Sequence, residues 1–161
     1  MANCYHGVFE PCSFVIEDQG LLMLNAQQVQ EIIYQGLPAA SEEGLRVEQV
    51  GDHRARVRTP FRESALRPGG TLSGPTMMGL ADAAMYAAIL AALGRVEMAV
   101  TQNLNINFLS RPAPRDLIAE AVILRLGRRS AVLEVQLFSE GGEEMVAHVT
   151  GTYALPASTR A

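Results

Sequence analysis

The chain has 161 residues, 48% of them hydrophobic and 19% charged, which suits one folded domain with a full hydrophobic core. All 13 basic side chains are arginines, so chemistry that needs a Schiff-base lysine or the lysine of a phosphate-binding loop is excluded. The net charge of -4 argues against a nucleic-acid-binding protein, since such proteins normally carry a basic surface.

The N-terminal stretch shows no regular hydrophobic period. We therefore expect residues 1–24 to form an extension and residues 25–161 to form a single domain. No Lys or Arg precedes Arg46, so no secretory leader is predicted, and we expect a cytoplasmic protein. Two cysteines, Cys4 and Cys12, are too few for a zinc site, and we expect neither a metal nor a cofactor.

A helix and a hairpin are predicted to open the domain. The segment NAQQVQEIIYQGLP is typical of an amphipathic helix that Asn25 caps and that Gly36 ends. The segment PAASEEG after it is predicted to be a loop. Two short strands, at 44–51 and 53–61, follow with a tight turn between them, so we expect a β-hairpin.

Three arginines alternate along the second of these strands. Arg54, Arg56 and Arg58 share one face, which suggests either an anion-binding site or a solvated face. We favour the solvated face, on which the arginines lie opposite Glu48 of the partner strand and form cross-strand charge pairs.

The longest apolar segment, residues 73–93, is predicted to be the central helix. Ser73 is placed to cap it, and Pro75 suits its first turn. A helix that is apolar all round belongs in a core or in a membrane, and Gly79 and Asp82 argue against a membrane span. Asp82 is the only charged residue of this helix. Burying its carboxylate is costly unless the group has a partner or serves chemistry.

Four extended segments follow the central helix, at 97–110, 115–128, 130–140 and 144–156. The short turns SRPAP, GRR and EGGE connect them, so we predict an antiparallel meander. The segments are long for strands, which suits a sheet curved around the central helix. The predicted fold is therefore α+β, with one long helix wrapped by a six-stranded antiparallel sheet.

Residues 25–156 resemble the hotdog-fold acyl-CoA thioesterases, in particular those related to the phenylacetate-pathway thioesterase. Members of that family open the central helix with His-Gly-Gly and carry an Asp or Glu nine residues after the His, in a stretch such as Leu-Ala-Asp. Here the triplet reads Ser73-Gly74-Pro75, and the Leu-Ala-Asp stretch ends at Asp82.

Two further positions belong to the resemblance. The segment VTQNLNINFLSRPAP matches the family's next strand, where a Ser or Thr often assists the acid, and Thr101 has that place. Six residues before the triplet the family often has an Asn, and this chain has Arg67. The resemblance makes Ser73, Pro75 and Arg67 candidates for binding the substrate.

The resemblance implies that the protein hydrolyses acyl-CoA thioesters. Asp82 would activate a water molecule as a general base or attack the carbonyl as a nucleophile. The amide N–H of Gly74, at the positive end of a helix, would bind the oxyanion, and Thr101 from a partner subunit would orient the water. The site would lie between two subunits of a homodimer, within a tetramer, with neither nucleic acid nor membrane as a partner.

Further candidates for substrate contacts rest on residue type. Arginine binds phosphate well, so Arg111, Arg128 and Arg129 are candidates for the phosphates of CoA, although turn arginines are usually just solvated. Asn103 and two further asparagines form a polar row that is predicted to share a face with Thr101. That row would line a subunit contact or an acyl channel.

Each of these assignments has a plainer alternative. Asp82 could hydrogen-bond a neighbouring element, Ser73 could act only as a helix cap, and Thr101 could be an ordinary strand residue.

Two other functions also stay open. One is a non-catalytic acyl-CoA-binding module, and the other is a hydratase or dehydratase of acyl thioesters, which would normally need a histidine beside the acid.

Overall fold

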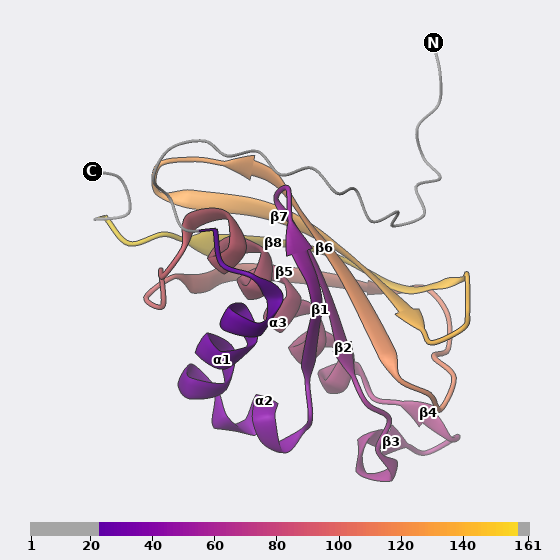
Figure 1. Cartoon of the computed structure of the whole chain (residues 1–161). Coiled ribbons are helices and arrows are strands. Elements are labelled where there is room, and N and C mark those ends of the chain that lie inside the picture. The colour runs from indigo at the N-terminus through magenta and orange to yellow at the C-terminus, as the bar shows by residue number, and fades with distance from the viewer. Residues whose placement is uncertain (1–22, 158–161) are drawn as a thin grey trace.

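The computed structural model describes residues 23–157 (Figure 1). The predicted extension 1–24, apart from its last two residues, lies outside that range, as do Cys4 and Cys12. The helices are α1 (Ala26–Gly36), α2 (Pro38–Glu42) and α3 (Gly74–Leu93). The strands of the main sheet are β1 (Arg46–Gly51), β2 (Arg54–Thr59), β5 (Val100–Phe108), β6 (Leu117–Leu126), β7 (Ser130–Ser139) and β8 (Met145–Ala154). Between β2 and α3 lie a 3-10 turn (Glu63–Ala65) and a two-stranded ladder of β3 (Leu66–Arg67) and β4 (Thr71–Leu72).

The main sheet is antiparallel throughout, with the strand order β1-β2-β6-β7-β8-β5. It curves around α3, and α1 packs beside α3 and β1 (Figure 1). The predicted α+β architecture, one long helix wrapped by a six-stranded antiparallel sheet, is confirmed.

The predicted four-strand meander is wrong in one place. Strands β6, β7 and β8 do form a meander, but β5 pairs with the far edge of β8 instead of with β6. The hairpin occupies the free edge of β6, with Thr59 opposite Leu117. Turn length gives no warning of this, because the proline-rich connection 109–116 also suffices to cross the end of the sheet. The loop predicted after α1 is also wrong, since Pro38 opens the short helix α2 there.

Helix α1 begins and ends where predicted. The Asn25 side chain accepts a hydrogen bond from the amide of Gln28 at 3.0 Å, and the Gln28 side chain accepts one from the amide of Asn25 at 3.0 Å. This reciprocal pair satisfies N–H groups that the start of a helix leaves without partners. Val29, Ile32 and Ile33 form its buried face.

Helix α3 is the core helix of the domain. The Ser73 side chain accepts from the amide of Thr76 at 3.5 Å, Pro75 lies in the first turn, and Gly94 caps the other end. By length and composition α3 could cross a membrane, with a mean hydropathy of 1.6 over an 18-residue window. In the fold, however, 61% of that window is buried, as in the core helix of a globular domain.

Arg56 and Arg58 of β2 form the charge pairs predicted for them, whereas Arg54 forms no ion pair with a residue in 23–157. Arg56 Nε lies 2.9 Å from Glu48 Oε2, Arg58 also pairs with Glu48, and Arg58 Nη1 lies 3.1 Å from Asp116 Oδ2. Burial raises the pKa of Glu48, but its hydrogen bonds with Arg58 and Arg56 outweigh burial and hold the pKa below its usual value. The charge-pairing interpretation is therefore confirmed for Arg56 and Arg58 and not for Arg54.

Helix α3 and strand β8 meet at a glycine. A Cβ on Gly151 would lie 2.5 Å from Sδ of Met85 and 3.1 Å from the main-chain oxygen of Asn103. Met85 is 0% exposed, so its side chain has no solvent into which to move. The lack of a side chain at Gly151 thus permits the close packing of helix on sheet.

We expect Gly151→Ala to lower the free energy of unfolding by about 1–3 kcal/mol, because the added methyl group would overpack the core. Chemical denaturation at neutral pH measures this loss. Gly36→Ala is the matched control, since a Cβ there meets nothing within 4 Å and should leave stability unchanged or slightly raised. Equal stability of the two variants would contradict the packing argument.

Candidate active site

The acid predicted to be catalytic lies half-buried on α3, within reach of β5 and β8. Asp82 Oδ1 accepts hydrogen bonds from Thr101 Oγ1 at 2.6 Å and from Tyr153 Oη at 2.8 Å. Thr101 and Tyr153 are opposite each other in the ladder between β5 and β8. No residue within 23–157 donates to Asp82 Oδ2, so that oxygen is available to another molecule.

Thr101 reaches Asp82 within one chain, which corrects the expectation that a partner subunit supplies it. The cause is a β-bulge. Thr101 pairs with Tyr153 and Asn103 pairs with Thr152, which leaves Gln102 as an extra residue in β5. The extra residue reverses the alternation of the strand, so Thr101 faces α3.

The same bulge places the asparagine row on the outer face of the sheet. Asn103, Asn105 and Asn107 are exposed, whereas Leu104 and Ile106 between them pack against the core. The prediction that Asn103 shares a face with the acid's threonine is therefore wrong. The structure does not bring Asn103 to the acid.

Tyr153 is a candidate site residue that the sequence analysis missed. Its side chain is 3% exposed, and its ring stacks on that of Tyr86 with the ring centroids 6.3 Å apart. Burial, and then the negative charge of Asp82, raise the pKa of Tyr153 far above its usual value. The hydroxyl therefore stays protonated and acts as a hydrogen-bond donor to Asp82. A signal exists in the sequence, because Val149, Gly151 and Tyr153 alternate on the buried face of β8. A hydroxyl on such a face needs a partner.

Asp82 also lines a cavity of about 450 Å³ between α2, α3 and the segment that follows β2. Pro75, Gly79 and Leu80 contribute to the same wall of α3. The predicted residues Pro75 and Asp82 therefore share one cavity.

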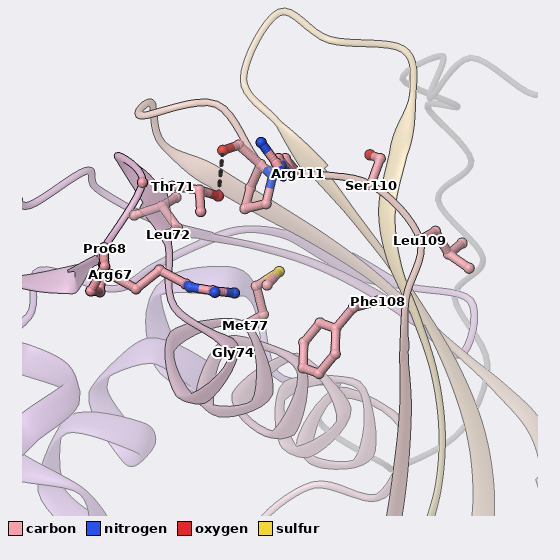
Figure 2. A pocket seen from close by; sticks show the side chains of 12 residues that line it. Arg67, Pro68, Thr71, Leu72, Gly74, Met77, Phe108, Leu109, Ser110 and Arg111 are labelled. Atoms are coloured by element: carbon pink, nitrogen blue, oxygen red, sulfur yellow. Dashed lines mark hydrogen bonds between the residues drawn. The ribbon is translucent and has the colours of Figure 1, made fainter.

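A second cavity, also of about 450 Å³, opens at the first turn of α3 (Figure 2). Gly74, Arg67 and Arg111 all line it, so three of the predicted site residues come together there. Figure 2 shows the guanidinium of Arg67 reaching across the first turn of α3 toward Phe108. Neither arginine forms an ion pair with any residue in 23–157, so both are available to an anion.

Gly74 combines a free amide with a lack of space for a side chain. Its N–H donates to no residue that the structure describes, as expected for the first turn of a helix. A Cβ on Gly74 would lie 3.1 Å from the ring of Phe108. A small group that approaches this turn can therefore meet a main-chain donor directly.

The remaining candidates lie apart from both cavities. Ser73 acts as the predicted helix cap, with its hydroxyl 2.9 Å from Thr76 Oγ1, and a contact between Ser73 and the substrate stays a prediction. Arg128 and Arg129 are exposed in the turn between β6 and β7 and line neither cavity. The structure does not bring these two arginines to Gly74 or Asp82 of the same chain.

Gly74 and Asp82 do not meet within a single chain. They are eight positions apart on α3, which is about 12 Å along a helix axis, and they line different cavities.

Within residues 23–157, no group of three or more His, Cys, Asp or Glu residues is placed to hold a metal ion.

Comparisons with known proteins cover most of the domain. Residues 69–146 match the family model described as the thioesterase superfamily. A crystal structure from a Silicibacter species, provisionally named a thioesterase, is 37% identical and superimposes with a TM-score of 0.76 over 84% of this chain and 94% of that one. A mutant of the phenylacetic acid degradation protein PaaI from Thermus thermophilus is 30% identical, with a TM-score of 0.64 over 73% of this chain and 97% of that one. A relative from Halobacterium salinarum, provisionally named an esterase, is 34% identical over 99 residues, which are 58% of this chain and 65% of that protein. That last match spans just under two thirds of the relative's length.

We expect Tyr153→Phe to lower the free energy of unfolding by about 1–2 kcal/mol at neutral pH, because Asp82 loses one of its two donors. The variant should also flatten the alkaline pH dependence of stability. The folded-state pKa of Tyr153 is raised, so above pH 10.0, its ordinary pKa, the unfolded chain releases a proton that the folded chain keeps. Wild-type stability therefore falls as pH rises above that value.

Chemical denaturation between neutral pH and about pH 11 measures both effects of Tyr153→Phe. Thr101→Val is the control, because it removes the other donor to Asp82 but no titrating group. The control should lose stability at neutral pH and keep the wild-type alkaline slope. A Tyr153→Phe variant with the wild-type alkaline slope would show that this phenol is not the group concerned.

Proposed function

Because the chain belongs to the thioesterase superfamily and has the hotdog fold expected from its sequence, we propose that it hydrolyses an acyl-CoA thioester through Asp82. One observation carries the proposal. The single acid of the core helix has one oxygen held by two hydroxyl donors, while its other oxygen is free. That oxygen is not buried, so a water molecule or a substrate can reach it.

Asp82 can act in either of two ways. As a general base, its Oδ2 takes a proton from a water molecule whose oxygen attacks the thioester carbonyl carbon. The tetrahedral intermediate then expels the thiolate, and protonated Asp82 passes its proton to the thiolate sulfur. The products are a carboxylic acid and a free thiol. As a nucleophile, Oδ2 attacks the carbonyl carbon, the C–S bond breaks and the thiolate leaves, which gives a mixed anhydride of Asp82 and the acyl group. Water then cleaves the anhydride to the carboxylic acid and protonated Asp82, whose proton passes to the thiolate to give the free thiol. In both routes Thr101 and Tyr153 fix the orientation of the carboxylate.

The thioester carbonyl needs a donor as negative charge develops on its oxygen, and the free N–H of Gly74 suits that role. Within one chain, Gly74 and Asp82 are about 12 Å apart along the helix, too far for one carbonyl to contact both. We therefore place the site between two subunits, with Gly74 from one and Asp82 from the other.

Strand β5 indicates how a homodimer would produce such a site. It lies at an edge of the sheet, its Thr101 end contacts Asp82, and its Phe108 end packs beside Gly74. In an antiparallel pairing of two β5 strands across a two-fold axis, the Phe108 end of one strand lies beside the Thr101 end of the other. The Gly74 amide of one chain would then approach the partner subunit's Asp82.

Apolar side chains exposed along this edge support the dimer. Met98, Val100, Phe108 and Leu109 are 76%, 57%, 51% and 57% exposed. An unpaired edge strand with such side chains favours pairing with a second chain. A tetramer of two such dimers belongs to the same proposal and rests on the family resemblance alone.

The arginines supply the cationic part of the proposed substrate site. Arg67 and Arg111 share the Gly74 cavity, and a guanidinium is well suited to phosphate. In the proposal Arg111 binds a phosphate of CoA, while Arg67 lies beside the thioester, over the first turn of α3 (Figure 2). Arg128 and Arg129 could reach the substrate only across the dimer, because their turn lies at the Tyr153 end of the sheet.

The two rival functions have less support. A hydratase or dehydratase would need a histidine beside the acid, but His53 and His148 line neither cavity. A binding module without turnover is supported only by Ser73 in the place of the family histidine.

We expect Asp82→Asn to lower kcat for acyl-CoA hydrolysis by about 100- to 10,000-fold with little change in KM, because an amide is neither a base nor a nucleophile here. Release of free thiol, followed with a thiol-reactive dye, measures the rate. Thr101→Val should cost only about tenfold, since Tyr153 still holds Oδ1. Undiminished turnover by Asp82→Asn would sink the catalytic role, and acyl-CoA binding without turnover by the wild-type protein would favour the binding module.

Mixing two inactive variants tests whether the site is shared between chains. Gly74→Pro removes the amide N–H, and Gly74→Ala is its control because it keeps the N–H but meets the same Phe108 ring. Coexpression of Asp82→Asn with Gly74→Pro should restore about a quarter of wild-type activity, since half of the dimers are mixed and each mixed dimer has one intact site. If each site belonged to a single chain, the mixture would stay inactive.

A further inference from the structure

Gly79 lies in the interior of α3, although nothing in the surrounding protein requires a glycine there. It is not among the residues with positive φ, and a Cβ at this position would meet no atom within 4 Å. A glycine inside a helix is less favourable than an alanine, because it loses more backbone freedom on folding. Stability alone would therefore favour alanine, which points to a use for the space that Gly79 leaves open.

The open space beside Gly79 is the cavity of about 450 Å³ that Asp82 also lines. Gly79 and Asp82 are three positions apart, so they are neighbours on one face of the helix. The region of α1 and α2 contributes aliphatic walls from Leu37, Ala40 and Leu45. A cavity of this size, lined mainly by apolar residues with polar and charged groups among them, is typical of small-ligand sites.

We propose that this cavity holds the acyl group of the substrate and that Gly79 sets its width, an inference that rests on the proposed thioesterase function. The occupant is an uncharged, apolar acyl group that lies against the bare backbone of α3 at Gly79. Its carbonyl carbon then lies about one helical turn further along, beside Asp82.

Charge around the cavity disfavours an acyl group that ends in a carboxylate. Asp82 and Glu43 both line the cavity and would repel a second anion. Arg62 is the one guanidinium among the described residues of the lining and donates to the main-chain oxygen of Glu42, so two carboxylates outweigh one cation there.

The kinetic test compares Gly79→Ala and Gly79→Leu with the wild-type protein on straight-chain substrates from acetyl-CoA to decanoyl-CoA. Gly79→Leu should lower kcat/KM at least about tenfold for decanoyl-CoA and less than about twofold for acetyl-CoA. Gly79→Ala should lower kcat/KM for decanoyl-CoA less than Gly79→Leu does. It should also raise Tm by about 2–4 °C, since it removes a helix glycine. Met78→Leu is the control, because Met78 is an exposed neighbour that lines neither cavity.

Two kinetic outcomes would overturn the inference. An unchanged or uniformly lowered profile of kcat/KM across acyl lengths for Gly79→Leu would show that the acyl chain does not lie at Gly79. A preference of the wild-type protein for succinyl-CoA over butyryl-CoA would show that the acyl group is not of the uncharged class.

A binding measurement separates this inference from the proposed function. In the Asp82→Asn background, decanoyl-CoA and free CoA are titrated calorimetrically against the variants with and without Gly79→Leu. The Kd for decanoyl-CoA should rise at least about tenfold while the Kd for CoA stays within about twofold. This result is expected whether or not the wild-type protein turns over a thioester, and equal changes for the two ligands would overturn the acyl site.

Discussion

A carboxylate on an otherwise apolar helix is the constraint on which the rest of this structure depends. Asp82 is half-buried, and no residue of α3 donates to its carboxylate, so its hydrogen-bond donors come from other elements. Thr101 on β5 and Tyr153 on β8 supply them. The two strands must therefore be neighbours, and the strand order of the sheet, with β5 at the free edge of β8, meets that demand.

The features that could be predicted from the sequence depend on residues close to one another along the chain. Asn25 and Ser73 cap the helices that they were predicted to cap, and Arg56 pairs with Glu48 across a hairpin. The overall α+β architecture also follows, because an apolar helix of this length needs a sheet around it. Strand order between distant segments has no such local signal, so the place of β5 could not be predicted from turn length.

The residues of the candidate site were easier to predict than their arrangement. Gly74, Arg67 and Arg111 do share a cavity, but Asp82 lies on a different one. The separation of two helical turns between Gly74 and Asp82 follows from their spacing on one helix, but the sequence does not show which other elements enclose each of them. Tyr153 was missed because its role appears only once β8 is placed against α3.

The bulge at Gln102 also affects how this chain is compared with its relatives. It divides β5 into two parts of opposite phase, so that Thr101 belongs to the inner face and Asn103 to the outer face. In a relative without the extra residue, a hydroxyl with the same task would stand one position nearer to the asparagines. Roles along this strand should therefore be transferred between proteins by superposing backbones, since counting residues from the central helix would exchange the hydroxyl that donates to the acid for a surface amide.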